Sequence, residues 1–160
     1  MAQTLNGKFR PNDADSYAVD VGQWRHVIGN YNFTDDTGAA AAYTIFTVTG
    51  DVLLNIFGLC QVTCGSGGVA KIELGIAGNT AALIAQATAT ELVQYEAWID
   101  ATPTLANPAA SDVFGGNRQF VVAAGSDVIF TISAVDLNAG DVDFHAFYMP
   151  LSLDGAVVAN

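Results

Sequence analysis

The stretch TVTGDVLLNIFGLC, residues 47–60, decides the predicted fold. An apolar run, Tyr43–Val48, ends at a Thr-Gly-Asp turn, and a second apolar run continues from Val52 to Val62. Glycine and aspartate favour turns, because glycine accepts positive φ angles and the aspartate side chain hydrogen-bonds to nearby backbone. The second run is apolar on both faces, with Asn55 as its main polar interruption, which is typical of a strand inside a sheet. We therefore predict two β-strands joined by a turn, the second of them central.

The chain repeats this pattern of strands and turns beyond the opening stretch. Residues 71–76 alternate apolar and polar side chains, which predicts a strand with one solvated face. The alternation returns over residues 128–133, and the Asn-Ala-Gly sequence at 138–140 predicts a turn into a last strand, Val142–Met149. Residues 39–160 are therefore predicted to form an all-β body, an antiparallel β-sandwich that is jelly-roll-like, or a barrel.

Two segments are less regular. The alanine-rich residues 79–99 could form a helix capped by Asn79 or Thr80, or two short strands. The β-branched content and the β surroundings favour the strands, so we predict no helix longer than two turns in the body. Residues 101–116 contain two prolines and a glycine pair, which predicts an irregular loop.

Residues 1–38 are predicted to form an extended N-terminal arm. They show weak periodicity but hold five aromatic residues, too many for a solvated linker. The arm is therefore expected to pack either on its own body or on a neighbouring protein. Arginine and tryptophan are enriched at binding hot spots, and aromatic rings bring large apolar area. The predicted partner-contact residues are Phe9, Arg10, Trp24 and Arg25.

The charge balance excludes some partners. The chain has 16 acidic and 5 basic residues, a net charge of −11, which opposes binding to nucleic acid or to an anionic membrane. Charged residues make up 13% of the chain, against about 25% in an average soluble domain. No apolar run is long enough for a membrane-spanning helix, and the N-terminal stretch lacks the apolar core of a secretory signal. We expect a homo-oligomer that covers part of the apolar surface.

The two cysteines, Cys60 and Cys64, lie in GLCQVTCGSGG, residues 58–68. A zinc site needs about four ligands, and the chain has no second cysteine pair and two histidines at unrelated spacing. On one extended strand their Cα atoms would be about 13 Å apart, whereas a disulfide needs less than about 7 Å. We predict buried or partly buried thiols, with a disulfide across a turn or a metal site as alternatives. No metal or cofactor is predicted.

Catalytic patterns are weak. His145 and Asp143 alternate on one face of a predicted strand, but no serine or cysteine is placed by a motif to act as a nucleophile. The acidic pairs lack the spacing of an EF-hand loop. A cross-strand or interface histidine is the simpler interpretation, and we predict that the protein is not an enzyme.

Several stretches resemble small proteins encoded near the major capsid gene of tailed bacteriophages. They are TVTGDVLLNIFGLC (47–60), IELGIAGNTAALIAQATATEL (72–92), EAWIDATP (96–103) and VDFHAFYMPLSLDGAVV (142–158). Some proteins of this kind are decoration, or cement, proteins of the phage head. The resemblance implies a small, β-rich and commonly trimeric protein that clamps neighbouring capsomers.

The expected function is therefore to decorate and cement the outer surface of a phage capsid after synthesis in the host cytoplasm. The expected partner is the major capsid protein, in addition to copies of the chain itself, with a trimer favoured by the resemblance. The alternatives are a phage tail, fibre or carbohydrate-binding β-sandwich module, and an enzyme. A carbohydrate-binding module would expose Trp24, Trp98 or tyrosines in a row on one face.

Overall fold

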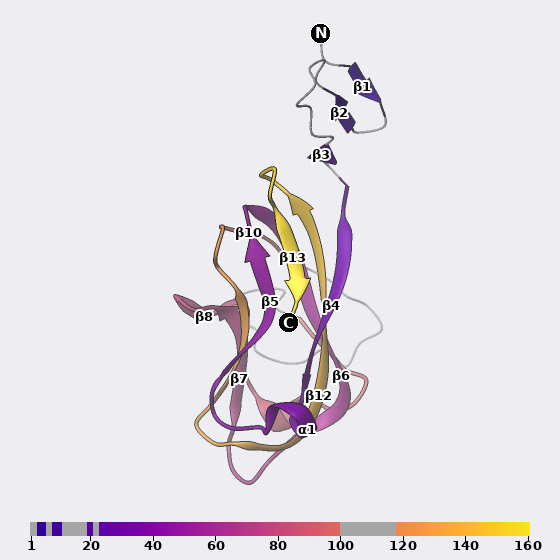
Figure 1. Cartoon of the computed structure of the whole chain (residues 1–160). Helices are drawn as coiled ribbons and strands as arrows, with labels where there is room; N and C mark the ends of the chain where they lie inside the picture. Colours follow the sequence, from indigo (N-terminus) through magenta and orange to yellow (C-terminus); the bar gives the residue numbers. More distant parts are fainter. Residues whose placement is uncertain (1–2, 6–7, 11–18, 21–22, 100–117) are drawn as a thin grey trace.

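The computed structural model shows two antiparallel β-sheets packed face to face (Figure 1). It describes the backbone of residues 3–5, 8–10 and 19–20, and all of residues 23–99 and 118–160. The elements are β1 (Gln3–Leu5), β2 (Lys8–Arg10), β3 (Val19–Asp20), β4 (Arg25–Asn32), α1 (Phe33–Asp36), β5 (Ala42–Thr49), β6 (Val52–Ser66), β7 (Lys71–Ile76), β8 (Asn79–Thr88), a 3-10 turn (Ala89–Glu91), β9 (Ala97–Trp98), β10 (Gln119–Val122), β11 (Val128–Ser133), β12 (Leu137–Pro150) and β13 (Ala156–Ala159).

The first sheet, called the β12 sheet, has the strand order β10-β6-β12-β4, with β9 paired to β6. The second, called the β11 sheet, has the order β13-β5-β11-β7-β8. All described strand pairs are antiparallel. The predicted all-β antiparallel sandwich is confirmed, and β6 is a central strand as the opening stretch predicted.

The core lies between the two sheets and is centred on aromatic rings. Phe144 of β12 and Phe130 of β11 face each other with ring centroids 5.5 Å apart. Trp98 of β9 and Tyr31 of β4 contact Phe130 at 6.1 and 4.8 Å. All four side chains are fully or almost fully buried. Because aromatic rings bury the largest apolar areas, this cluster contributes strongly to holding the sheets together.

The turn after β5 connects the two sheets instead of forming a hairpin within one. β5 belongs to the β11 sheet and β6 to the β12 sheet, so the chain crosses the sandwich at Gly50. Gly50 has a φ of 56°, which glycine adopts without strain. A Cβ atom there would also collide with Ser152 and Asp154, so the crossing needs a glycine for two reasons.

Residues 79–99 form strands, so the alternative of a helix is wrong. β8 pairs with β7, and the 3-10 turn and β9 follow it.

The predicted solvated face of β7 is also wrong at Glu73, which is only 9% exposed. Thr80 and Gln86 of β8 donate hydrogen bonds to its carboxylate, the second at 2.8 Å. These partners satisfy the charged group that the sheet buries.

The turn predicted at residues 138–140 is wrong, because these residues lie inside β12. β12 stays paired with β6 across this segment through register shifts between Leu137, Ala139 and Asp141. Gly140, at a φ of 147°, lies among these shifts. The polar residues that resembled a turn are therefore absorbed as irregularities of one long strand.

The N-terminal segment divides into two parts. Residues 25–32, predicted to belong to the arm, are β4 and pair with β12 along their whole length. That assignment is corrected, because Tyr31 of β4 is fully buried in the core of the sandwich. β1, β2 and β3 form a separate three-stranded sheet that lies beyond the end of the sandwich from which β4 starts (Figure 1). The loop predicted at 101–116 falls outside the described residues.

Candidate interaction surface

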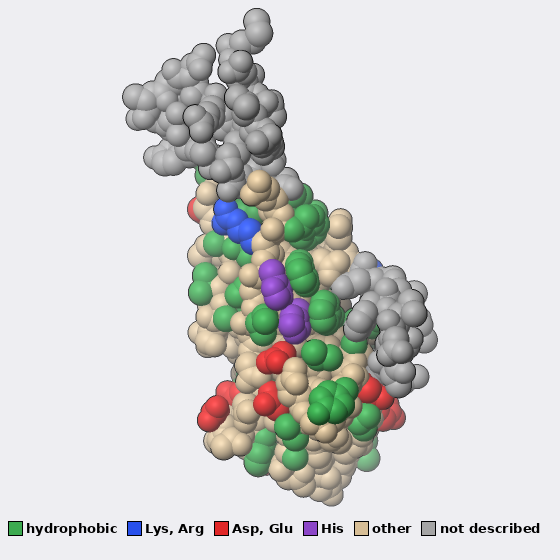
Figure 2. Space-filling view, turned by 90° about the vertical axis from the view of Figure 1, so that its right-hand side faces the viewer, with side chains coloured by type: hydrophobic (Ala, Val, Ile, Leu, Met, Phe, Trp, Pro, Cys, Tyr) green, Lys and Arg blue, Asp and Glu red, His purple; other side chains and the backbone are tan. Residues whose placement is uncertain are grey.

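Four aromatic rings gather on the outer face of the β12 sheet. We call them the ring cluster; its members are His26 of β4, Phe57 of β6, and His145 and Phe147 of β12. They point outward because the residues that alternate with them in β6 and β12 are buried. His26 lies 4.4 Å from Phe147, and Phe57 lies 5.0 Å from His145, between ring centroids. Figure 2 shows both histidines at the surface with apolar side chains beside them.

The two histidines form a hydrogen bond through their rings. Nε2 of His26 lies 3.1 Å from Nδ1 of His145, the ring centroids are 5.3 Å apart, and the ring planes differ by 9°. The centroid distance exceeds the nitrogen distance by roughly two ring radii, so the nearly coplanar rings meet edge to edge. One nitrogen must donate a proton and the other must accept it.

The surroundings of His145 favour its neutral form. Burial of the ring lowers the pKa of His145, and the neighbouring His26 lowers it further, whereas Asp143 opposes both effects. Burial and a neighbouring imidazole both disfavour a positive charge on the ring, and they outweigh the carboxylate of Asp143.

Beside the ring cluster, amide side chains bind the carboxylates of β12. Asn30 Nδ2 donates to Asp141 Oδ1 at 2.7 Å and to Asp143 Oδ1 at 2.9 Å. Asn32 Nδ2 donates to Asp141 Oδ2 at 2.9 Å, and Gln61 Nε2 donates to Asp143 Oδ2 at 2.8 Å. The network joins β4, β12 and β6 on the outer face. Asp143 is thus engaged by amides, and the conceivable catalytic pair of Asp143 and His145 does not form a hydrogen bond.

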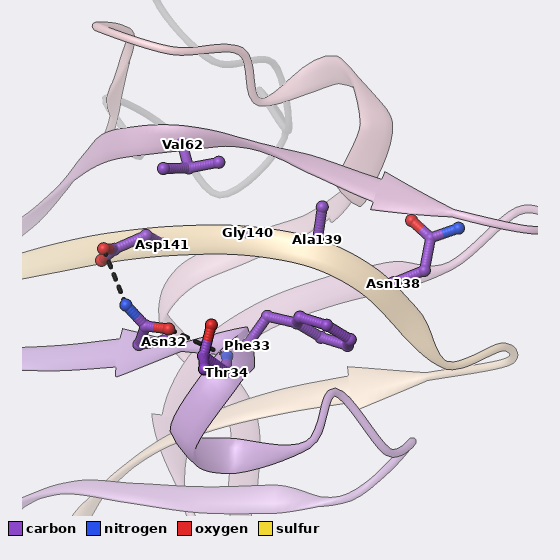
Figure 3. Close-up of a pocket in the computed structure, with 8 residues that line it drawn as sticks. All are labelled: Asn32, Phe33, Thr34, Val62, Asn138, Ala139, Gly140 and Asp141. Atoms are coloured by element: carbon purple, nitrogen blue, oxygen red, sulfur yellow. Dashed lines mark hydrogen bonds between the residues drawn. The ribbon is translucent and has the colours of Figure 1, made fainter.

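A shallow pocket of about 220 Å³ lies where the β12 sheet meets α1 (Figure 3). Its lining residues are Asn32, Phe33, Thr34, Val62, Asn138, Ala139, Gly140 and Asp141. Asn32 shapes one wall, since its side-chain oxygen accepts a hydrogen bond from the Thr34 amide at 2.9 Å and caps α1. This lining combines a carboxylate with amides, a hydroxyl and apolar side chains, which suits contact with a protein side chain. Among the described residues, no group of three or more histidine, cysteine or acidic side chains could hold a metal ion.

The predicted partner-contact residues fall in two places. Trp24 is 44% exposed, and Arg25 is exposed at the start of β4, next in sequence to His26. Phe9 and Arg10 belong to β2, whose side chains lie outside the described residues. The structure therefore places Trp24 and Arg25 at the start of β4, the strand that contributes His26 to the ring cluster.

Trp98, a candidate for a sugar-binding platform, is only 1% exposed and packs in the core. A sugar ring stacks on an aromatic face that is open to solvent, so Trp98 cannot serve as one. Trp98 is therefore not part of the exposed row of aromatic residues that is expected of a carbohydrate-binding module.

Both cysteines are buried and free, as predicted for structural thiols. Cys60 and Cys64 lie four residues apart in β6 and both point toward the core, whereas Val62 and Thr63 between them are exposed beside a register shift between β6 and β12. Cys60 Sγ donates a hydrogen bond to the Val62 carbonyl at 3.2 Å. The pKa of the Cys64 thiol is raised, mainly by its hydrogen bond with Cys60 and also by burial. The Cys64 sulfur therefore stays protonated and unreactive at neutral pH.

Sequence reasoning missed the ring cluster. His26 and His145 lie 119 residues apart, and no motif connects them. Strand parity placed His145, with Asp143 and Phe147, on one face of the predicted last strand, and the structure shows that this is the outer face. The contact with His26 depends on recognising β4 as a strand and on its pairing with β12.

No helix among the described residues is long and apolar enough to cross a membrane. No protein-family model and no curated protein matches the sequence.

Comparison with solved structures finds chains of similar fold. One is a chain in the capsid asymmetric unit of cyanophage Pam1, with a TM-score of 0.51 and 17% sequence identity over 88% of this chain and 97% of that chain. Another is a chain in the acidic stable capsid structure of Helicobacter pylori bacteriophage KHP30, with a TM-score of 0.49 and 9% identity over 88% and 96% of the two chains. The likeness is one of fold.

Proposed function

We propose that this protein is a structural component of a bacteriophage capsid that decorates and cements the outer surface by binding between major capsid protein subunits. The observation that carries the proposal is the shared fold with a chain of the cyanophage Pam1 capsid. The superposition takes in 88% of this chain and 97% of the Pam1 chain, so the two chains are of similar length. The likeness is thus to a whole small chain and not to one domain of a much larger protein.

Charge supports a place on the outside of the shell. The net charge of −11 disfavours contact with packaged DNA, because DNA binding depends on cations that neutralise phosphate. The outer face of the β12 sheet carries Asp141 and Asp143, whose described hydrogen-bond partners are amides.

Exposed apolar groups on the same sheet supply a surface for protein contact. Ile28 of β4 is 47% exposed beside the ring cluster, and Val62 is 48% exposed at the pocket. Apolar side chains grouped with aromatic rings on one face are typical of a protein interface. We assign the contact with the major capsid protein to this face and to the N-terminal segment.

The N-terminal segment is proposed as an anchor, with Phe9, Arg10, Trp24 and Arg25 as contact residues. The sheet of β1–β3 has three strands of two or three residues each, too small to bury a core of its own. Such a segment gains stability by packing on a partner, either the capsid or a neighbouring copy. We further propose a homotrimer that is made in the host cytoplasm, is located on the virion surface and has no catalytic activity.

Binding to capsids that lack the protein tests the proposed function. Purified protein is mixed with undecorated heads, and the heads are sedimented and analysed for bound protein. We expect saturable binding at a fixed ratio to the major capsid protein, and greater resistance of the decorated heads to heat. Heads that bind none of the protein would contradict the proposal.

A matched pair of variants tests the anchor. Trp24→Ala with Arg25→Ala removes two proposed contacts at the end of β4, whereas Tyr95→Ala removes a side chain that is 77% exposed elsewhere. We expect the double variant to lose about tenfold or more in affinity for heads, the effect of a hot spot. Equal affinity of the double variant and the control would show that the anchor lies elsewhere.

A further inference from the structure

β4 is an edge strand whose two halves are held differently. Among the described strands, β12 is its one neighbour in the sheet order. Its C-terminal half is fixed by the fully buried Tyr31 and by Asn30 and Asn32, whose amides bind the carboxylates of β12. In its N-terminal half, the described side-chain attachments are the partly buried Val27, the stacking of His26 on Phe147 and the hydrogen bond of His26 to His145. The N-terminal half is also where the small sheet of β1–β3 joins the sandwich.

The His26–His145 hydrogen bond depends on the number of protons that the pair carries. In the neutral pair, one ring nitrogen donates and the other accepts. One added proton leaves an acceptor on the other ring, so the bond persists and becomes charge-assisted. A second added proton turns both facing nitrogens into donors. Two positive rings would then meet at the present nitrogen separation of 3.1 Å, and they would repel each other.

Few described groups near the pair could offset the second charge. Asp143 of β12 faces His145 and opposes the lowering of its pKa, so this carboxylate offsets part of one added charge while it also accepts hydrogen bonds from Asn30 and Gln61. Arg25, next to His26 in β4, adds a positive charge. β6 contributes the ring of Phe57, which does not titrate. Among the described groups, one carboxylate therefore faces two added positive charges, and the doubly protonated pair is only partly compensated.

We propose that His26 and His145 form a proton-operated latch, which holds the N-terminal half of β4 on β12 at neutral pH and releases it when both rings are protonated. Release frees the strand end from which the N-terminal segment continues, while Tyr31 and the amide network keep the C-terminal half in place. The latch rests on the geometry of the sheet and does not depend on the proposed capsid role.

The ring geometry favours a shared proton over a shared metal ion. In nearly coplanar rings that meet edge to edge, the two nitrogens point at each other, which suits a hydrogen bond. A tetrahedral zinc ion needs both lone pairs to converge on a point away from the line between the nitrogens, and it needs further ligands. Zinc is therefore a useful control, because it should not replace the proton.

Hydrogen–deuterium exchange of the full chain tests the latch. Protection factors, corrected for the intrinsic effect of pH on exchange, are compared for peptides covering residues 25–28 and 30–36. From about pH 7.5 to about pH 5, we expect protection of the first peptide to fall about tenfold or more, and that of the second to stay constant. In His145→Gln, where no second ring can charge, the fall should disappear. Equal changes in both peptides, or the same fall in the variant, would overturn the proposal.

A titration of the unaltered protein keeps the test independent of whether the variant folds. The chain has two histidines, so two sets of imidazole proton signals report the pair in nuclear magnetic resonance spectra. We expect the rings to titrate as a coupled pair in two separate steps, with added zinc leaving both steps in place. Two independent titrations at the ordinary pKa of histidine, or loss of both steps with zinc, would rule the latch out.

Discussion

At the scale of single residues, His145 ties the stability of the fold to pH. Its pKa is lowered in the folded chain, first by burial and then by His26, below its ordinary value of 6.5. The unfolded chain therefore binds more protons in this range, and stability rises with pH. The stability that depends on a neutral His145 is fully present above about pH 6.5, and it is lost as the pH falls through the lowered pKa of His145.

We accordingly expect the free energy of unfolding to decrease on acidification below about pH 6.5, measured by urea unfolding at a series of pH values. His145→Gln should flatten this part of the profile, because glutamine does not titrate. Parallel profiles for the two proteins would assign the acid sensitivity to other groups.

Gly29 shows how closely the sheets approach at one residue. A Cβ atom on Gly29 of β4 would lie 2.6 Å from the Ile45 side chain and 2.9 Å from the Phe46 ring, both on β5. We expect Gly29→Ala to lower the free energy of unfolding by about 1–3 kcal/mol through overpacking. The control is Gly67→Ala, since a Cβ atom there meets nothing within 4 Å, and its effect should stay within about 0.5 kcal/mol. Similar losses in urea unfolding for both variants would contradict a tight contact at β4.

At the scale of elements, we expect the sandwich to need β4 but not the sheet of β1–β3 that precedes it. A chain beginning at Gln23 keeps β4 and loses the sheet of β1–β3. We expect it to remain folded, with a Tm within a few degrees of the full chain. A chain beginning at Gly38 loses β4 and the buried Tyr31, exposes the edge of β12, and should aggregate or unfold.

Circular dichroism melts and size-exclusion chromatography of the two shortened chains measure this difference. Unfolding of the chain that begins at Gln23 would show that β1–β3 belong to the core. A folded, soluble chain beginning at Gly38 would show that the sandwich tolerates an open edge at β12.

Sequence periodicity predicted the strands whose buried positions carry large apolar side chains, such as β6, β11 and β12. It missed β4, because one of the inward positions of that strand is Gly29 and apolar Ile28 points outward. Alternation is visible only where burial and apolarity coincide. It also gave a false turn at 138–140, since the partner strand, which decides whether polar residues end a strand or bulge within it, is remote in the sequence.

The candidate site was less predictable than the fold. Trp24 and Arg25 are predicted as contacts from residue type alone and stay a prediction, whereas the ring cluster depends on the register of three strands. Residues brought together by pairing between distant strands carry no local signal, so their contact follows only from the assembled sheet.

At the scale of the whole molecule, the composition leaves apolar surface to cover. Charged residues make up 13% of the chain and hydrophobic residues 51%. We expect a homotrimer in solution, with a mass three times that of the protomer by light scattering, and a dependence on concentration set by the affinity between copies. The mass of one protomer from micromolar to millimolar concentration would limit assembly to the capsid surface.

The crossing at Gly50 has a consequence for biosynthesis. Because the chain changes sheets there, β5 and β6 do not pair with each other; β5 pairs with β11 and β13, while β6 pairs with β9, β10 and β12. β4 likewise pairs with a strand that is made much later, β12. During translation, the first three strands of the sandwich therefore emerge from the ribosome before any of their ladder partners, and neither sheet can close until the C-terminal strands are made. We therefore expect the sandwich to fold only after β12 has emerged from the ribosome, so that its early apolar strands stay exposed or chaperone-bound until then.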